Sequence, residues 1–321
     1  MKVDSRMNYT ISDCRMLSAS IKEITVSPLA TGCAVPAAGA HFKWFIPELN
    51  EWRHYSAVQL AGRTTQQGSV VFAIRLTADS VSSRYIRSLA VNDTVQLNGP
   101  FNTFTYPLTE DVGRDIAIAG GIGITPLTGI LQHLTSLNRS AHLHYFVRSD
   151  DDAAYALPMQ ALLQERLHLH FSNQPEGRRS VSQVLADLAP HDRLYVCGPQ
   201  SMLNEVFCHA EANGLARERI HFEIFNVVRE DDASAFVIDA VESGVSVNVN
   251  SDQSLLEALE AAGLDPLYDC RRGECGVCAI EVVEGEVDHR DFIMSEQEAA
   301  CSTTIYPCVS RAKSQRLKLA I

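Results

Sequence analysis

The stretch CRRGECGVC, from Cys270 to Cys278, places three cysteines in the spacing Cys-x4-Cys-x2-Cys. A structural zinc site more often combines two Cys-x2-Cys or His pairs, and this loop has one such pair. A single pair with another cysteine five positions before it is the plant-type spacing of a 2Fe–2S cluster. Gly273 and Gly276 would let the backbone curve closely around the cluster. The stretch therefore predicts a 2Fe–2S site, with zinc or inert buried thiols as the alternatives.

The fourth thiolate must come from a distant segment, where the chain offers Cys301 and Cys308. Cys308 lies shortly before a final strand expected at 316–319, and its distance from the loop is similar to that in plant-type ferredoxins. Cys301 follows a helix expected at 295–300 and has no such support. With all iron positions filled by cysteine and sulfide, the cluster would carry electrons that another part of the chain supplies. The predicted ligands are Cys270, Cys275, Cys278 and Cys308.

The composition narrows the class of protein. The 321 residues suffice for two or three domains, and 46% apolar with 21% charged residues is a globular composition. A net charge of −12 without a basic stripe argues against a nucleic-acid-binding protein. The uncharged run 116–132 is interrupted by glycines and a proline, so we expect no membrane insertion.

The cysteine count and the charge distribution add two expectations. Nine cysteines, an odd number, and the lack of a signal-peptide pattern favour a cytoplasmic protein without a disulfide framework. Residues 236–321 contain fifteen Asp and Glu against seven Lys and Arg. This excess predicts either a solvated face or a docking surface for a basic partner. Arg271, Arg272 and Glu274 either belong to such a surface or are solvated charges.

The pattern of expected elements indicates a multidomain protein. Short strands between turns, such as 70–76 and 94–97, predict an antiparallel β-barrel in residues 1–111. Alternating strands and helices predict a doubly wound α/β domain in residues 112–228, with strands at 115–119, 142–147, 168–171 and 193–197. A polar linker at 229–235 then leads to a third domain, residues 236–321, which contains strands, a helix expected at 254–262 and the cysteine loop.

A glycine-rich turn, Ala119-Gly120-Gly121-Ile122-Gly123-Ile124-Thr125-Pro126, joins the first strand of the α/β domain to a helix expected at 127–137. Glycines permit a tight turn and the close approach of a pyrophosphate, which the helix N-terminus would bind. Proline suits the first helical turn, where its missing N–H is not needed. An ordinary strand–helix turn is the alternative. The residues predicted to bind a dinucleotide here are Gly120, Gly121, Gly123, Thr125 and Pro126.

Two further strand ends support the dinucleotide site, because open α/β sheets bind ligands at the carboxyl ends of their strands. One strand ends in Cys197-Gly198-Pro199, which would place Cys197 beside the bound ring, with a small buried thiol as the alternative. Another strand end carries Arg148, which could pair with a phosphate. The acidic run 150–152 follows and would repel the 2′-phosphate of NADPH, so we expect NADH.

The barrel region contains two polar motifs. In Arg53-His54-Tyr55-Ser56, arginine can bind a phosphate bidentately, tyrosine can stack on a flavin and serine can bond its edge. Ser82-Ser83-Arg84 precedes a short helix expected at 85–89 and could form a second anion site. A simple helix N-cap is the alternative for this second motif.

In this order, Arg53–Ser56, the turn 119–126, Tyr195–Pro199 and the C-terminal cysteines resemble the motifs of the phthalate dioxygenase reductase family. Vanillate demethylase and carnitine monooxygenase reductases share this layout, and the resemblance covers nearly the whole chain. It implies an FMN-binding barrel, an NADH domain of the ferredoxin-reductase type and a plant-type ferredoxin domain of the β-grasp fold. The serines at 82–83 stand where relatives often have glycines, and Phe101 where many have arginine.

The resemblance assigns the flavin to the barrel. Arg53, Tyr55 and Ser56 would hold FMN, with FAD as the less favoured cofactor, and Ser83 and Arg84 would bind its phosphate.

The resemblance also assigns the nicotinamide site. Gly121, Thr125 and Pro126 would shape it, with Cys197 near the hydride donor. Phe225 matches an aromatic residue that lies near the flavin in relatives, and plain core packing is its alternative. The implied catalytic residues are Thr125, Cys197 and Phe225.

The implied function is that of an NADH-dependent reductase component of a two-component Rieske-type oxygenase or demethylase. A hydride would pass from NADH to FMN, and single electrons would then pass through the cluster to a separate terminal oxygenase. We expect a monomer. The alternatives are a reductase for a haem monooxygenase and a binding module with a zinc loop and a vestigial nucleotide fold.

Overall fold

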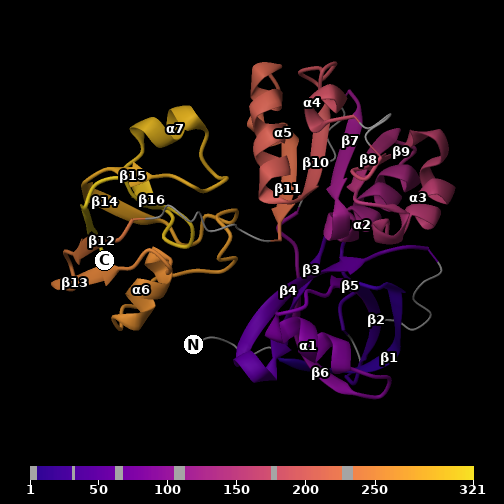
Figure 1. Cartoon of the computed structure of the whole chain (residues 1–321), viewed down its shortest axis with the longest axis horizontal. Helices are drawn as coiled ribbons and strands as arrows, with labels where there is room; N and C mark the ends of the chain where they lie inside the picture. Colours follow the sequence, from indigo (N-terminus) through magenta and orange to yellow (C-terminus); the bar gives the residue numbers. More distant parts are fainter. Residues whose placement is uncertain (1–5, 31–32, 62–67, 105–112, 175–178, 226–233) are drawn as a thin grey trace. The chain divides into compact units, whose positions relative to one another are not determined.

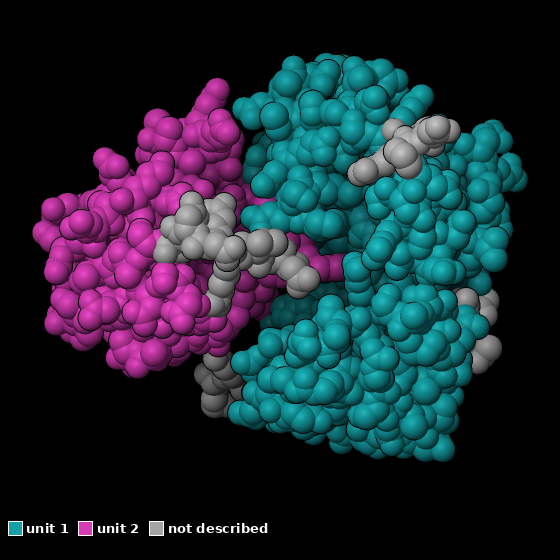
Figure 2. Space-filling model, viewed as in Figure 1, with its two compact units in different colours: residues 1–223 teal, residues 224–321 magenta. Residues whose placement is uncertain are grey.

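A computed structural model of the chain describes residues 6–30, 33–61, 68–104, 113–174, 179–225 and 234–321. It contains two compact units, Met1–Glu223 and Ile224–Ile321 (Figure 2). Most of the linker expected at 229–235 lies outside the described residues. None of the helices in the described ranges has the length and apolar character needed to cross a membrane.

The first unit begins with the antiparallel β-barrel expected from the sequence (Figure 1). The barrel is closed in the strand order β1-β2-β5-β4-β3-β6. Alternate residues of β3, Phe42, Trp44 and Ile46, are fully buried in its core, as the two-residue period of a strand requires. Its elements are β1 Met7–Ser18, β2 Ile21–Pro28, β3 His41–Ile46, β4 Glu51–Val58, β5 Val70–Arg75, α1 Val81–Ser88 and β6 Thr94–Phe101.

The second part of this unit is the doubly wound α/β fold expected from the sequence. Its sheet has the order β11-β10-β7-β8-β9, and the pairs β10–β7, β7–β8 and β8–β9 are parallel. Helices α2 and α3 lie on the opposite side of the sheet from α4 and α5 (Figure 1). The elements are β7 Asp115–Gly120, α2 Ile124–Ser136, β8 Ala141–Val147, α3 Ala156–Leu163, β9 Leu167–Phe171, α4 Val181–Val184, β10 Arg193–Gly198, α5 Gln200–Ala212 and β11 Ile220–Ile224.

Polar contacts join the barrel to the α/β sheet within the first unit. The Tyr155 hydroxyl donates to Glu23 Oε2 over 2.6 Å, and both side chains are buried. The backbone amide of Gln59 donates to Thr128 Oγ1 on α2 over 3.1 Å. Because α2 is attached to the barrel in this way, the turn that precedes α2 is held beside the barrel.

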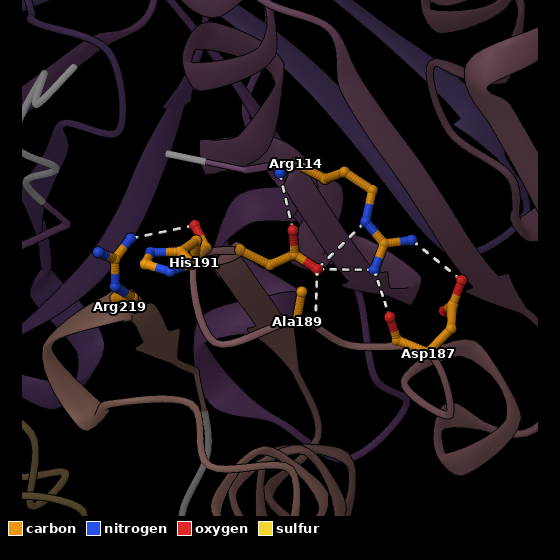
Figure 3. Close-up of polar contacts among 6 residues, drawn as sticks. Arg114, Asp187, Ala189, His191 and Arg219 are labelled. Carbon is orange, nitrogen blue, oxygen red and sulfur yellow. Dashed lines mark hydrogen bonds and ion pairs between the residues drawn. The ribbon is translucent and has the colours of Figure 1, made fainter. Parts of the chain in front are cut away.

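A buried carboxylate organises the amino ends of β7 and β10. Asp192, 1% exposed, accepts hydrogen bonds from the Arg114 amide over 2.8 Å and from Arg114 Nη2 over 2.6 Å. Arg114 also bonds the backbone oxygen and the carboxylate of Asp187 (Figure 3). A side chain at Gly113 would lie 2.6 Å from Asp192 Oδ1, so this turn requires glycine. The network lies at the end of the strands opposite to the edge predicted to bind the nucleotide, and it is structural.

The second unit has the β-grasp arrangement, with a mixed sheet ordered β13-β12-β18-β14-β16. Helix α6 packs its apolar side chains, Leu255, Ala258 and Leu259, into the core of this unit. It starts at a capping box formed by Ser254 and Glu257. The elements are β12 Phe236–Ala240, β13 Val245–Val249, α6 Leu255–Ala261, β14 Ile280–Glu284, β15 Val287–Asp288, α7 Glu296–Cys301, β16 Thr304–Ile305, β17 Arg311–Ala312 and β18 Arg316–Leu319.

Two helices begin earlier than the sequence predicts. Helix α2 starts at Ile124 instead of residue 127, because the glycine-rich turn is itself a 3₁₀ turn, Gly121–Gly123, that continues into the helix. Helix α1 starts at Val81 instead of residue 85, because the Ser80 side chain caps it by accepting the Ser83 amide over 3.3 Å.

Candidate cofactor sites

The crevice expected to bind a dinucleotide lies where the strand order of the α/β sheet reverses. The chain moves outward from β7 to β8 and β9 and then returns to β10 on the other side of β7. Strands β7 and β10 pair from Asp115–Arg193 to Ala119–Cys197. Their carboxyl ends therefore lie side by side at the position where doubly wound folds bind ligands.

The glycines of the two strand ends pack backbone against backbone. A side chain at Gly123 would place its Cβ 2.1 Å from the Cys197 carbonyl oxygen. At Gly120 a Cβ would lie 2.6 Å from Pro199 Cδ and 3.1 Å from Gly198 Cα. Such distances exclude any side chain at Gly120 or Gly123. These two glycines are therefore required by the packing of the turns, whether or not a ligand approaches.

Gly121 differs from the other glycines of the turn. Its φ of +53° lies in the left-handed region, and a Cβ would meet only Arg75 Nη1, 3.8 Å away. The open space over Gly121 is therefore the part of the turn that a ligand can approach, and Arg75 from β5 reaches toward it. Sequence reasoning missed Arg75, because no motif near the end of β5 points to a turn some forty-five residues later.

Two helices begin at this edge without a side-chain cap. Helix α2 follows the glycine turn and α5 follows Pro199, and neither has a side-chain hydrogen bond at its N-cap. Uncapped amides and the positive end of the helix dipole suit a phosphate. The Thr125 hydroxyl is occupied, since it donates to the Ile122 carbonyl over 3.0 Å and the residue is 2% exposed. Thr125 and the buried Pro126 therefore shape the turn from within.

The other residues predicted for the nucleotide and flavin sites differ in exposure. Cys197 is the penultimate residue of the buried strand β10 and is 0% exposed. Arg148 and Asp150 are exposed at the end of β8, and Ser149 Oγ donates to Asp152 Oδ2 over 3.0 Å. Phe225 directly follows β11 and is half-buried.

Strand β4 brings the first flavin motif together with α1. Tyr55 is half-buried against the barrel core, and its hydroxyl interacts with Ser82. Burial raises the pKa of Tyr55 to about 12, while nearby Arg53 and the bond to Ser82 act in the opposite direction. Arg53 is exposed and pairs with Glu51 over 2.7 Å. Arg53 and Tyr55 therefore lie on the same side of β4, and Ser82 of α1 lies beside Tyr55.

The other two residues of this motif lie on the opposite side of β4, as alternation along a strand requires. The His54 ring stacks on His41 with centroids 5.1 Å apart. The buried Ser56 donates from Oγ to Glu223 Oε2 over 2.9 Å. Glu223, 1% exposed, was missed by sequence reasoning, since nothing local distinguishes it from an ordinary strand residue.

The residues of the second flavin motif occupy the first turn of α1. Ser83 is buried, and its Oγ accepts the Thr77 amide over 3.0 Å. Ser82 Oγ lies 2.8 Å from the capping Ser80 Oγ, and Arg84 is exposed. The serines therefore stabilise the helix start, and Arg84 extends from it.

In the second unit the four predicted cluster ligands come together. Cys278 Sγ and Cys308 Sγ lie 3.4 Å apart, and hydrogen bonds link Cys270 with Cys275 and with Cys308. Cys270, Cys278 and Cys308 are buried and Cys275 is half-buried. Cys301, the other candidate, is exposed at the end of α7.

The environment of the four thiols fits a cluster held by thiolates. Hydrogen bonds from Cys275 and Cys308, and a bond of 3.2 Å from the Arg272 amide, lower the pKa of Cys270. The hydrogen bond to Cys270 raises the pKa of Cys275 and that of Cys308. Deprotonation of one thiol is thus favoured by its neighbours, and a thiolate is the form that binds iron.

The loop backbone is adapted to this site. Gly273 and Gly276 have φ values of +72° and +75°, and a side chain at Gly273 would lie 2.6 Å from Val309 Cγ2. In the described part of the chain, no three His, Cys, Asp or Glu side chains form a group suited to one metal ion. A 2Fe–2S cluster makes a different demand, since its four thiolates are shared between two irons. The residues present fit such a cluster.

The charges that flank the loop are paired. Arg272 Nη2 and Glu274 Oε1 are 2.7 Å apart, with side chains 10% and 5% exposed. Arg271 Nη2 lies 2.7 Å from both oxygens of Glu260, and its guanidinium stacks over Tyr268 at 4.2 Å. The expectation that Arg272 and Glu274 offer free charges on a surface is wrong, because each neutralises the other within the loop.

The closed barrel, the doubly wound sheet and the β-grasp unit with its four thiols define a flavin- and NAD-dependent iron–sulfur reductase. Comparisons with protein families agree. The oxidoreductase FAD-binding domain matches residues 35–106, the oxidoreductase NAD-binding domain 117–207 and the 2Fe–2S iron–sulfur cluster binding domain 238–313. These matches confirm the three predicted kinds of cofactor, namely a flavin, NAD and a 2Fe–2S cluster. At the cysteine loop they favour the cluster over zinc.

Full-length relatives narrow the class to one family. The chain is 34% identical to vanillate O-demethylase oxidoreductase of Pseudomonas sp. strain HR199, covering 96% of this chain and 98% of the relative. It is 33% identical to the heme-dependent oxidative N-demethylase beta subunit of Ectopseudomonas mendocina, covering 95% and 96%. The chain belongs to the phthalate dioxygenase reductase family, as its motifs predicted.

Solved structures agree with this assignment. The structure of phthalate dioxygenase reductase matches 99% of this chain and 98% of its own length, with 25% identity and a TM-score of 0.71. Full-length CYP116B46 from Tepidiphilus thermophilus matches 98% of this chain, with 28% identity and a TM-score of 0.71. In that second case the present chain spans 42% of the longer protein.

Proposed function

We propose that this chain is the NADH-dependent reductase component of a two-component oxygenase or demethylase, with FMN as its flavin and a Rieske-type protein as its electron acceptor. The single observation that carries the proposal is that one chain holds a nucleotide crevice beside a barrel and four gathered thiols. Bound flavin would supply the means to accept a hydride and release single electrons.

On this proposal the flavin lies along the Arg53 and Tyr55 side of β4. The Tyr55 ring offers a face for the flavin ring, and Arg53 and Arg84 offer guanidinium groups for the phosphate. Ser56, fixed by its bond to Glu223, presents its hydroxyl at the seam between the barrel and the α/β sheet.

The nicotinamide dinucleotide would bind at the switch point. The open side of Gly121, the start of α5 and the Arg75 guanidinium surround the position proposed for its pyrophosphate. Arg148 would bind the remaining phosphate oxygens, and Cys197 would lie beneath the nicotinamide ring. Exposed Asp150 and Asp151 would repel a 2′-phosphate, which favours NADH over NADPH.

The proposed cluster ligands are Cys270, Cys275, Cys278 and Cys308. Cys270, Cys278 and Cys308 are buried, which limits the access of water to them, and Leu256 and Tyr306 form one cluster with Cys278 and Cys308. The proposed acceptor docks on the second unit, whose acidic composition favours a partner with basic charges.

The test is to purify the full chain and determine its cofactors and acceptors. We expect a flavin with the mass of FMN, two irons per chain, rapid flavin reduction by NADH, and cytochrome c reduction that requires the iron. A flavin with the mass of FAD would overturn the FMN assignment. A colourless protein that contains zinc would overturn the proposal as a whole.

A haem-containing oxygenase is the second candidate for the acceptor. Two similarities favour it, namely those to the beta subunit of a heme-dependent oxidative N-demethylase and to full-length CYP116B46, a cytochrome P450. Pull-down with the holoenzyme, followed by the absorption spectrum of the captured protein, distinguishes a Rieske centre from haem.

A further inference from the structure

A short segment of the second unit, residues 289–294, lies between the two stretches that carry the thiols. The Phe292 amide donates to the Gly273 carbonyl of the cysteine loop over 2.9 Å. The Arg290 amide donates to Ser310 Oγ, two residues after Cys308, over 3.1 Å. The segment thus contacts the cysteine loop on one side and the Cys308 stretch on the other.

The side chain of Asp291 organises this segment. It is 0% exposed, and its Oδ1 accepts the amides of Ile293 and Met294 over 3.1 and 3.0 Å. Its Oδ2 accepts the hydroxyl of the fully buried Ser310 over 3.4 Å and lies 3.6 Å from His289 Nδ1. A buried carboxylate is costly unless it is hydrogen-bonded, so this arrangement is strongly determined by its partners.

The backbone at Asp291 packs closely against Gly273 of the cysteine loop. A side chain at Gly273 would meet Val309 Cγ2 at 2.6 Å and the Asp291 Cα at 3.2 Å. Ile293 and Met294, whose amides Asp291 binds, pack against the buried cluster that contains Cys278 and Cys308. The carboxylate therefore fixes a segment that contacts both the cysteine loop and the stretch that carries the fourth thiol.

We propose that Asp291 is a positioning residue of the iron–sulfur centre that also lowers its reduction potential. This inference rests on the proposed ligand set. The hydrogen bonds of Asp291 hold the Cys270–Cys278 loop and Cys308 at the separation that the cluster requires. Its negative charge, shielded from water, disfavours the addition of an electron nearby.

The test uses the full chain and measures iron content, the absorption and EPR spectra of the cluster, and its reduction potential. Asp291→Ala removes both acceptors and is expected to lose at least half of the bound iron. Asp291→Asn keeps the shape and an acceptor for the Ile293 and Met294 amides. It is expected to retain iron and to shift the potential of the cluster to a more positive value. Asp265→Asn, which removes an exposed carboxylate of the same unit, is the matched control. It is expected to change neither the iron content nor the reduction potential of the cluster.

The outcomes separate this inference from the proposed function. Wild-type iron content in Asp291→Ala would overturn the positioning role. A potential of Asp291→Asn equal to that of Asp265→Asn would overturn the electrostatic role. Loss of iron from Asp291→Asn would also contradict the inference, because asparagine retains the acceptor. Absence of iron from the wild-type protein would instead overturn the proposed ligands themselves.

Discussion

Ser56 Oγ donates a hydrogen bond to Glu223 Oε2 over 2.9 Å, although the two residues are 167 positions apart in the chain. Ser56 belongs to β4 of the barrel and Glu223 to β11 of the α/β sheet, and they are 4% and 1% exposed. The bond therefore joins the two folds of the first unit through a buried polar contact.

Glu223→Ala should destabilise the first unit and slow the reduction of its flavin by NADH. The substitution leaves the buried Ser56 hydroxyl without this acceptor, which costs about 1–3 kcal/mol of unfolding free energy. Glu223→Gln retains an acceptor and should lose less than half as much. Urea unfolding measures the first effect, and stopped-flow flavin reduction the second. Equal stability of the alanine and glutamine variants would contradict the role given to this bond.

Cys308→Ser should lose the cluster spectrum and the reduction of cytochrome c while flavin reduction by NADH survives. The reason is that the substitution removes one proposed ligand of the cluster and leaves the first unit unchanged. Cys301→Ser is the control, because Cys301 is exposed on α7. A complete cluster spectrum in Cys308→Ser, with its loss in Cys301→Ser, would move the fourth ligand to Cys301.

The wild-type protein should have a higher kcat/KM for NADH than for NADPH. Replacing Asp150 and Asp151 by asparagine should narrow that ratio roughly two- to fivefold per residue, the factor that corresponds to ~0.4–1 kcal/mol for an exposed charge pair. Steady-state kinetics with both cofactors measures the ratio. A wild-type ratio near one would remove the proposed role of these carboxylates.

His144 should make the stability of the first unit fall in mild acid. It belongs to a stack with His142, His168 and His170 across β8 and β9, and its Nδ1 lies 3.1 Å from His170 Nε2. Burial, and then the neighbouring His168, His170, His142 and Arg179, lower the pKa of His144 from 6.5 to about 3.

The sign of this effect follows from proton linkage. Below pH 6.5 the unfolded chain binds a proton at His144 that the folded chain does not bind, so stability falls as the pH drops toward 3. His144→Gln should flatten this part of the profile of unfolding free energy against pH. His209→Gln, on α5, is the control. An identical slope in wild type and His144→Gln would contradict the prediction.

Asp192→Asn should lower the unfolding free energy of the first unit by about 2 kcal/mol. This loss is smaller than that expected on breaking a fully buried ion pair, because Arg114 is partly exposed. Burial raises the pKa of Asp192, but hydrogen bonds from Arg114 and from backbone amides outweigh it, so the pKa is lowered. Its stabilising effect is therefore present above the unfolded pKa of ~3.9 and is lost as the pH falls through the lower folded value.

The matched control for Asp192 is Asp187→Asn. Asp187 bonds the same Arg114, but its side chain is 77% exposed, so the loss should stay below about 0.5 kcal/mol. Urea unfolding at pH 7, and at a pH below ~3.9 where the contribution of Asp192 is being lost, measures both variants. Equal losses in the two variants would contradict the structural role assigned to the buried carboxylate.

Much of the fold could be predicted because its signals are local. The strands at 193–197 and 245–249 match β10 and β13 within one residue, since a short buried run in β10 and an apolar–polar alternation in β13 specify strands directly. The starts of α1 and α2 were less predictable. Before α2 the glycines that suggested a loop form a 3₁₀ turn, in which Gly123 fits against the neighbouring strand end.

The sequence by itself determined the kind of cofactor. The spacing of Cys270, Cys275 and Cys278 is a local property of one loop, and the glycine-rich turn and its helix are adjacent in the chain. The chemistry of such motifs depends on residue type and spacing, which a sequence displays completely.

Only the tertiary structure decided which distant groups complete these sites. Glu223 reaches Ser56, Arg75 approaches Gly121, and Asp291 binds Ser310 because the barrel, the sheet and the β-grasp unit bring separate segments together. Each of these contacts depends on a distance of about 3–4 Å between residues remote in the chain, and the contacts of Glu223 and Asp291 depend on burial as well. No local pattern encodes such contacts, since these distances, and the desolvation of the buried groups, exist only in the packed structure.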